Sequence, residues 1–275
     1  MSPDGTDGAR LELADVTVRF GGLVALDGVG LTVDAGQVVG VIGPNGAGKT
    51  TLFNVLCGFV RPDSGRLLWR GRQLRGLQPH QLAGLGIART LQGLGLFPQL
   101  TVLENVMVGA HRHARARFAS ALLGLPRSDQ DERALRDRSL SLLAELGVEE
   151  MAGRLPASLP YPVQKRVALA RALVAEPDLL LLDEPAAGLS AEEMRQLGEL
   201  IGGLRGRMSV VLVEHHMDLV MSVCDQIVVL DFGRVIATGS PEEVRRNALV
   251  LEAYLGRDVE EGGVPPPGGA DARGA

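Results

Sequence analysis

Cysteine, aromatic residues and lysine are all scarce in this sequence. The two cysteines among 275 residues, Cys57 and Cys224, have neither metal-ligand spacing nor a disulfide framework, so we expect buried, reduced thiols. No apolar run reaches the roughly 18 residues typical of a membrane span, and residues 1–10 lack the apolar centre of a signal peptide. Hydrophobic residues make up 45% of the chain, which is enough for a packed core. We therefore expect a globular protein that stays in the cytosol.

The charge distribution gives little reason to expect a nucleic-acid partner. The formal net charge is -5. Arginines concentrate between Arg112 and Arg138, but acidic residues interleave with them and aromatic residues are few, which favours a solvated helical face over a nucleic-acid surface. Only two of the 28 basic residues are lysines, Lys49 and Lys165. We expect no nucleic-acid binding, and Lys49 stands out.

One segment organises the chain. It follows an apolar strand pattern at residues 38–42, precedes an apolar helix pattern at residues 51–60, and satisfies G-x-x-x-x-G-K-S/T. Its residues are Gly43, Pro44, Asn45, Gly46, Ala47, Gly48, Lys49, Thr50 and Thr51. Glycines let successive backbone amides turn toward a phosphate, the helix N-terminus adds its positive end, and the Lys49 ammonium pairs with the β- and γ-phosphates. The Thr50 hydroxyl is placed to hold Mg²⁺, so we predict a nucleotide-binding P-loop.

Two alternating segments, residues 11–20 and 29–33, predict half-buried strands ahead of the P-loop strand. Phe20 ends the first segment, and an antiparallel return of the chain would bring it beside the nucleotide. Its ring can serve either as an ordinary core residue or as a platform for the adenine base. Farther along, residues from about 93 to 176 follow helical patterns, which predicts a helical insert in an α/β chain.

The apolar run Leu179 to Leu182 predicts a fully buried parallel strand, and it ends in two carboxylates, Asp183 and Glu184. Ligands of such sheets gather at the C-terminal edge of the strands. Asp183 can bind Mg²⁺ through water, and Glu184 can orient and deprotonate the attacking water. The alternative is a solvated strand end.

A further buried strand is predicted at residues 210–213, immediately before Glu214, His215 and His216. A neutral His215 imidazole at the same sheet edge can hydrogen-bond the γ-phosphate. A structural role for the histidine is the alternative. Metal binding by the two adjacent histidines is a weaker reading, because neighbouring side chains on an extended chain diverge.

Taken together, these motifs resemble the ATP-binding subunit of an ABC transporter over about residues 11–256. The elements that carry the resemblance occur in the family's order: Phe20-Gly21, the P-loop, Gln92, a signature region near Leu159, the strand ending in Asp183-Glu184, Ala187-Gly188-Leu189-Ser190, and His215. Within that family, segments such as Arg89-Thr90-Leu91-Gln92 and Ala253-Tyr254-Leu255-Gly256 look most like the branched-chain amino acid importer ATPases. Urea-type and lipopolysaccharide-export ATPases are similar relatives.

The resemblance implies roles for individual residues and for partners. Phe20 would stack on adenine, Gln92 would bind the metal, sense the γ-phosphate and face a membrane permease, Glu184 would be the catalytic base, and His215 would hold the γ-phosphate. The implied architecture is a P-loop NTPase (RecA-like) parallel sheet with an N-terminal antiparallel β subdomain and a helical insert. The implied assembly is a head-to-tail pair of ATPase subunits, in which the signature residues Pro160, Tyr161 and Pro162 contact the nucleotide of the partner. Such a subunit is cytoplasmic and peripheral on the inner face of the cell membrane.

Three positions depart from the family pattern. A phenylalanine is usual where Leu91 stands, and an aspartate where Ser190 and His216 stand. The signature departs more strongly, because Leu159-Pro160-Tyr161-Pro162-Val163 replaces the expected L-S-G-G-Q or its Y-G variant. Proline has no amide hydrogen to donate to a phosphate, so a heterodimer with a second, different ATPase is expected, although the loop can instead tolerate proline at a helix start.

We expect one ABC ATPase domain over residues 10–256, with disordered residues 1–9 and a disordered tail over residues 257–275. The expected function is ATP hydrolysis that powers import of a small solute, such as a branched-chain amino acid, with ATP and Mg²⁺ bound. A non-hydrolysing regulatory subunit, a lipopolysaccharide-type exporter ATPase and a soluble DNA-repair ATPase are the alternatives. The last is disfavoured because the chain has no long heptad segment and no second P-loop.

Overall fold

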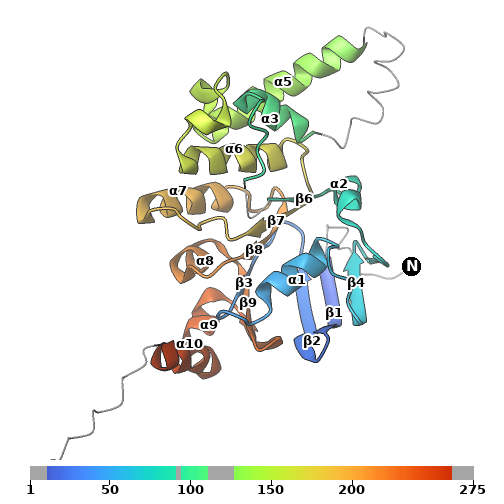
Figure 1. Ribbon diagram of the computed structural model, residues 1–275, viewed down its shortest axis with the longest axis vertical. Coiled ribbons are helices and arrows are strands. Elements are labelled where there is room, and N and C mark those ends of the chain that lie inside the picture. The colour runs from blue at the N-terminus through green and yellow to red at the C-terminus, as the bar shows by residue number, and fades with distance from the viewer. Residues whose placement is uncertain (1–10, 91–93, 111–126, 262–275) are drawn as a thin grey trace, which may run out of the picture.

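A computed structural model of the protein describes residues 11–90, 94–110 and 127–261. The fold contains two β-sheets, and a group of helices lies at one end of the molecule, beyond the larger sheet (Figure 1). The predicted α/β architecture is confirmed. No helix within these ranges combines the length and the apolar character needed to cross a membrane.

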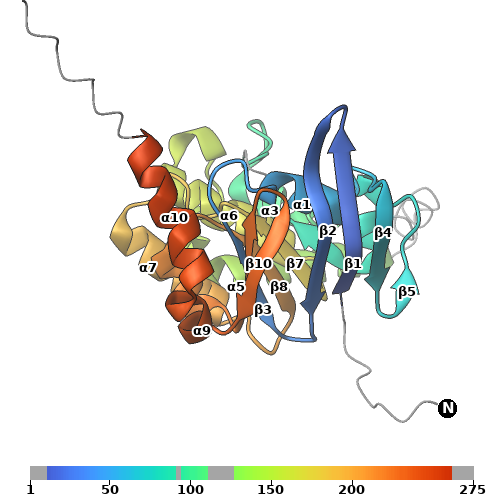
Figure 2. The same cartoon turned by 90° about the horizontal axis from the view of Figure 1, so that it is seen from below.

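The smaller sheet is antiparallel, with strand order β2-β1-β4-β5. Its strands are β1 (Leu11–Phe20), β2 (Leu23–Val33), β4 (Ser64–Trp69) and β5 (Arg72–Gln73). Alternate residues of β1, including Leu11, Leu13, Val16 and Val18, are buried, as the sequence pattern predicts for a sheet with one face on the core. Figure 2 shows the long strands β1 and β2 beside α1 (Lys49–Leu56), the helix that follows the P-loop.

The larger sheet has the order β10-β9-β3-β8-β7-β6 and is parallel from β9 to β6. Its strands are β3 (Val38–Ile42), β6 (Ile87–Arg89), β7 (Leu179–Asp183), β8 (Ser209–Val213), β9 (Gln226–Asp231) and β10 (Arg234–Gly239). Consecutive residues of the central strands enter different cores: Leu180 and Leu182 of β7 join one cluster, whereas Leu179 and Leu181 join the other. Both faces are therefore covered, which explains the uninterrupted apolar runs.

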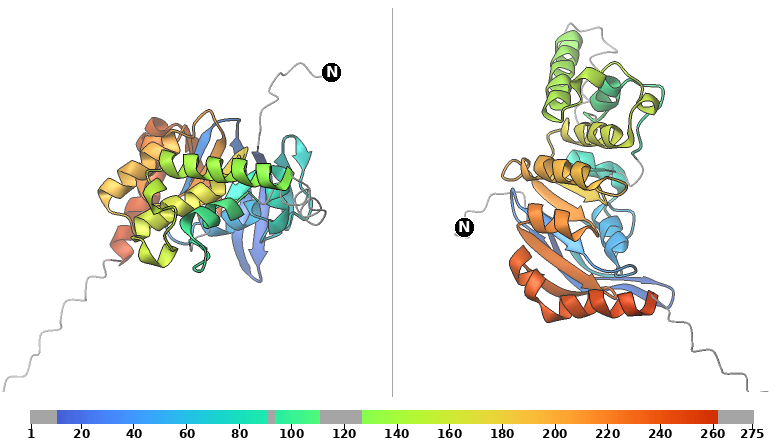
Figure 3. Two further views of the ribbon diagram at one scale, coloured as in Figure 1. Left: turned by 90° about the horizontal axis from the view of Figure 1, so that it is seen from above. Right: turned by 90° about the vertical axis from the view of Figure 1, so that its left-hand side faces the viewer.

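Helices predominate among the described residues between β6 and β7. The main ones are α3 (Val102–Val108), α5 (Arg127–Glu145) and α6 (Tyr161–Leu173), and they pack on one another, as the right panel of Figure 3 shows. Thr101 caps α3, because its hydroxyl accepts from the Glu104 amide while the Glu104 carboxylate accepts from the Thr101 amide. Helix α6 begins at Tyr161. Pro160 is the N-cap and Pro162 occupies the second helical position, where no intrahelical amide donor is required.

The remaining helices cover the large sheet and its open edge. They are α2 (Leu82–Leu85), α7 (Ala191–Gly202), α8 (Met217–Val223), α9 (Pro241–Arg246) and α10 (Ala248–Glu261). Ser240 and Glu243 form a capping box at the start of α9, with Pro241 at the first helical position. Helix α10 continues past Gly256, so the chain is helical over the first residues of the expected tail. A single glycine lowers helix stability by only about 1 kcal/mol, which the rest of the helix can offset. Both cysteines are buried and unpaired, as expected.

Candidate nucleotide-binding site

The P-loop joins β3 to α1 and lies at the C-terminal edge of the parallel strands. Gly48 is the N-cap of α1 with a φ of 103°, a left-handed conformation that favours glycine. At Gly43 a Cβ atom would lie 2.2 Å from the Leu230 carbonyl oxygen, which no side chain could tolerate. Glycine is therefore required at these two positions by the backbone path itself, before any ligand is considered.

The Lys49 ammonium is held inside the loop. Its Nζ donates to the carbonyl oxygens of Gly43 at 2.6 Å and Pro44 at 2.9 Å, and only 7% of the residue is exposed. Lysine side chains are rarely buried to this extent, so the loop places a cationic side chain beside the N-terminus of α1. The arrangement suits a polyphosphate, whose oxygens can replace the two carbonyls as acceptors.

A cavity of about 440 Å³ opens beside the loop. Its lining residues come from β1, β2, the P-loop, the residue after β7 and the β9–β10 turn: Phe20, Leu23, Val24, Ala25, Asn45, Gly46, Ala47, Gly48, Lys49, Thr50, Thr51, Glu184 and Phe232. The structure therefore brings Phe20, most of the predicted P-loop residues and Glu184 to one cavity. Phe20 is 52% exposed, so it is not a core residue.

The acidic pair stands at the end of β7. Burial, followed by the negative charges of Glu184 and Glu214, raises the pKa of Asp183 from its usual value of 3.8 to about 6. Glu184 adopts a φ of +44°, which non-glycine residues seldom adopt, while its amide donates to the Val213 carbonyl oxygen at 2.9 Å. A raised carboxyl pKa and a left-handed backbone at adjacent positions are frequent at sites that bind or process a ligand.

His215 follows β8, the strand between β3 and β7. Its Nδ1 lies 4.0 Å from Glu184 Oε1 and 3.6 Å from Glu214 Oε2, and the side chain is half exposed. The predicted proximity of His215 to the end of β7 is therefore present in the fold. P-loop, acidic pair and histidine all follow neighbouring parallel strands, whose C-terminal ends share one edge of the sheet.

Glu214 is a part of the site that the sequence reasoning named but did not use. It is fully buried and accepts hydrogen bonds from the amides of Ala186, His215 and His216 at 2.8 to 3.1 Å, and from His216 Nδ1 at 2.9 Å. Burial alone would raise the pKa of Glu214, but these donors outweigh it and lower the pKa. The carboxylate thus anchors the turn that presents His215. An acidic residue directly after an apolar strand was the available signal.

The three signature residues lie elsewhere in the chain. Pro160, Tyr161 and Pro162 begin α6 and are absent from the residues that line the P-loop cavity. The Tyr161 ring faces Gly188, where an added Cβ would lie 3.3 Å from the ring. Lys165, which the sequence analysis did not assign, lies 5.2 Å from the centre of that ring and donates to the Pro185 carbonyl oxygen at 2.6 Å. Gln92 is outside the described residues.

These features define the class of the protein. The ABC transporter family model matches residues 26–187, and the chain belongs to this family. A second model, described as branched-chain amino acid ATP-binding cassette transporter, matches residues 234–260, which form β10, α9 and most of α10.

Individual relatives are similar over most of the chain. It is 44% identical to the high-affinity branched-chain amino acid transport ATP-binding protein BraF of Pseudomonas aeruginosa, over 90% of this chain and 97% of that protein. It is 42% identical to LivG of Escherichia coli, which has the same descriptive name and equal coverage. The lipopolysaccharide export protein LptB of Haemophilus influenzae is 34% identical over 84% of this chain and 91% of LptB.

Solved structures agree with this assignment. A nucleotide-free ATP-binding cassette from an ABC transporter superposes with a TM-score of 0.77 at 28% identity, covering 90% of this chain and 98% of that one. The ADP conformation of the cassette MJ1267 gives a TM-score of 0.75 at 27% identity, covering 90% of this chain and 99% of that one. The fold predicted from the motif order is thereby confirmed.

Proposed function

We propose that this chain hydrolyses ATP and that hydrolysis drives import of branched-chain amino acids through membrane permease subunits. The observation that carries the proposal is the convergence of Lys49, Glu184 and His215 on neighbouring parallel strand ends. The identities of 42 to 44% with branched-chain amino acid transport proteins, against 34% with an exporter protein, favour import of that class of solute.

Nucleotide binding would use the P-loop as a phosphate cradle. The amides of its glycines and the α1 N-terminus face the phosphates, and Lys49 Nζ exchanges its two carbonyl acceptors for phosphate oxygens. Thr50, Asp183 and Gln92 offer hydroxyl, carboxylate and amide oxygens, the hard ligands that Mg²⁺ prefers. Mg²⁺ supplies charge neutralisation of the phosphates when bound. Burial and the two neighbouring carboxylates raise the pKa of Asp183, and a cation bound beside it would counter that shift by favouring the ionised carboxylate.

Glu184 is the proposed general base, and His215 the proposed partner of the γ-phosphate. Glu184 lines the P-loop cavity, so its carboxylate can accept a proton from a water placed beside the terminal phosphate. His215 Nδ1 is close enough to Glu184 Oε1, at 4.0 Å, for both side chains to meet one reacting group. Glu214 serves as a positioning residue for His215, because its carboxylate fixes the amide of the histidine.

Completion of the site requires a second ATPase subunit, because Pro160, Tyr161 and Pro162 lie away from this chain's own P-loop cavity. In a head-to-tail pair, the N-terminus of α6 would face the nucleotide of the partner. The two prolines leave that end short of donors, which favours a heterodimer in which this chain's P-loop is completed by a different signature.

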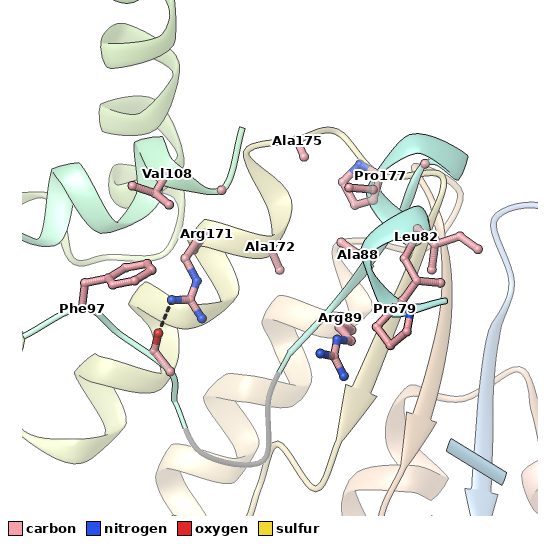
Figure 4. Close-up of a pocket in the computed structure, with 15 residues that line it drawn as sticks. Pro79, Leu82, Ala88, Arg89, Phe97, Val108, Arg171, Ala172, Ala175 and Pro177 are labelled. Carbon is pink, nitrogen blue, oxygen red and sulfur yellow. Dashed lines mark hydrogen bonds between the residues drawn. The ribbon is translucent and has the colours of Figure 1, made fainter. Parts of the chain in front are cut away.

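A groove between the helical group and the large sheet is the proposed permease contact. It encloses about 380 Å³, and Figure 4 shows Phe97 and Arg171 on one side and Arg89, Pro79 and Leu82 on the other. Phe97 is 46% exposed, as expected for an apolar side chain that a partner helix would cover. Binding there would place the protein on the cytoplasmic face of the cell membrane.

The test of hydrolysis is Glu184→Gln, which keeps the shape of the side chain and removes the base. ATP binding should persist while phosphate release, measured on the chain with its transporter partners, falls at least about 100-fold. Glu150→Gln, at an exposed acid of a short helical turn, is the matched control and should not change the rate. Phosphate release by Glu184→Gln within about twofold of the unmodified protein would remove Glu184 from this role. Leucine uptake by the reconstituted transporter tests the solute.

A further inference from the structure

We propose that Phe232, in the turn between β9 and β10, forms a second aromatic wall of the nucleobase subsite and contacts the base together with Phe20. The proposal rests on the proposed binding of ATP at the P-loop. Both rings line the same cavity, although they come from opposite ends of the sequence and from different sheets.

The turn that carries Phe232 is attached to the P-loop on one side. The Gly233 amide donates to the Ala47 carbonyl oxygen at 3.0 Å, so the residue next to Phe232 is hydrogen-bonded to the phosphate loop itself. On the other side, the Asp27 amide of β2 donates to the Gly233 carbonyl oxygen at 2.8 Å, and the Arg234 guanidinium pairs with the Asp27 carboxylate at 2.6 Å. Phe232 is therefore held in a defined place between the P-loop and the strand that follows Phe20.

Close packing of three backbone segments fixes the same junction. A Cβ added at Gly48 would lie 2.7 Å from the Ala25 carbonyl oxygen, and one added at Gly233 would lie at the same distance from it. The Cβ added at Gly48 would also lie 3.5 Å from the Gly233 Cα. The turn cannot move away from the P-loop without breaking the hydrogen bonds of Gly233 to Ala47 and Asp27. The fold therefore sets the distance between the P-loop and Phe232.

Phe232 and Gly233 form the two-residue hairpin turn between β9 and β10, and both adopt the positive φ that such a turn requires. The φ of Phe232 is +42°, in the left-handed region that glycine and asparagine adopt readily and phenylalanine does not. The residue is 74% exposed, so the turn does not bury the side chain in the core. The hairpin therefore sets the position of Phe232, and most of its surface is accessible to a ligand in the cavity beside the P-loop.

The surroundings indicate which part of a nucleotide the ring meets. Phe20, Leu23, Val24 and Phe232 are all exposed apolar residues, and all four line the cavity beside the P-loop. A polyphosphate occupies the amide-rich loop, which leaves the flat base for the apolar rim. Aromatic side chains bind bases through their ring faces, and such stacking tolerates different bases. The subsite should therefore favour a base over no base, with little distinction between adenine and guanine.

The experiment compares ATP with tripolyphosphate, which has the phosphates and no base, by calorimetric titration of the full-length chain. Phe232→Asn and Phe232→Gly keep a residue that tolerates positive φ and remove the ring, so the turn is preserved. Both variants should bind ATP about tenfold more weakly. Phe232→Tyr should stay within about twofold of the unmodified protein. Tripolyphosphate affinity should be the same in every case. Leu249→Asn, at an exposed leucine of α10, is the control for loss of a surface apolar group.

Two results would overturn the assignment of Phe232. Unchanged ATP affinity in the asparagine and glycine variants would show that the ring does not touch the base. An equal loss of affinity for ATP and for tripolyphosphate would show that the turn acts through the P-loop instead. A different outcome, in which the unmodified protein binds neither ligand, would refute the proposed nucleotide binding and this proposal with it.

Discussion

The unusual start of α6 leads to a quantitative prediction about dimerisation. The double substitution Pro160→Ser with Pro162→Gly, made in the Glu184→Gln background to prevent turnover, should strengthen the ATP-dependent dimer of this chain. The first four amides of a helix have no intrahelical partner and can bind a phosphate of the facing subunit. In α6 these positions are residues 160 to 163, and two of the four are prolines without an amide hydrogen.

The size of the effect follows from the number of donors. A hydrogen bond to a charged group contributes about 1.5–3 kcal/mol, so two restored amides correspond to about 3–6 kcal/mol at each nucleotide. Since 1.4 kcal/mol is a factor of ten, and imperfect geometry reduces the gain, we expect the dimer dissociation constant to fall at least about 100-fold. The helix N-terminus and the amides of Tyr161 and Val163 are present in both forms, so the difference isolates the two prolines.

Sedimentation velocity in saturating ATP and Mg²⁺ measures this change directly. The single Glu184→Gln protein should remain mostly monomeric at concentrations where the triple variant is dimeric. Pro241→Ala, which alters a proline at the first position of α9, controls for general effects of replacing a helix-start proline. If the two forms dimerise equally over the same ATP range, the reasoning about missing amides is wrong, and the loop tolerates proline.

Two further predictions concern the site and the groove. Asp183→Asn should stabilise the protein without nucleotide by about 1–2 kcal/mol at pH 8. The pKa of Asp183 is raised to about 6 in the folded protein, so the ionised carboxylate destabilises the fold. The partial exposure of the residue reduces the size of this effect. The advantage should shrink as the pH falls from about 6 toward 4, as measured by urea unfolding, and a pH-independent difference would contradict it. Phe97→Asp should release the chain from membranes that contain the permease while ATP affinity stays constant, with Leu249→Asp as the control; unchanged retention would exclude Phe97 from the contact.

The sequence was most informative where function depends on neighbouring residues. The P-loop could be predicted because its glycines, its lysine and its flanking strand and helix are consecutive, and β7 could be predicted because four leucines precede two acids. Glu214 and Phe232 were harder, because their importance depends on contacts between distant segments. The Glu214 carboxylate accepts from the amide of Ala186, 28 residues away in the sequence. Phe232 is positioned by the neighbouring Gly233, whose amide donates to the Ala47 carbonyl oxygen. Patterns of period two or 3.6 contain no information about such pairs.

One contact at the groove connects α6 to the segment that precedes α3. The Arg171 guanidinium donates to the carbonyl oxygens of Gly95 at 2.6 Å and Leu94 at 3.0 Å, so the segment after residues 91–93 is attached to this helix. Ten residues separate Arg171 from Tyr161, which at 1.5 Å per residue is about 15 Å. A rotation of the helix about Arg171 would therefore move its N-terminal end the most. A tilt of about 10° at Arg171 would displace Tyr161 by about 2.6 Å, roughly the length of one hydrogen bond.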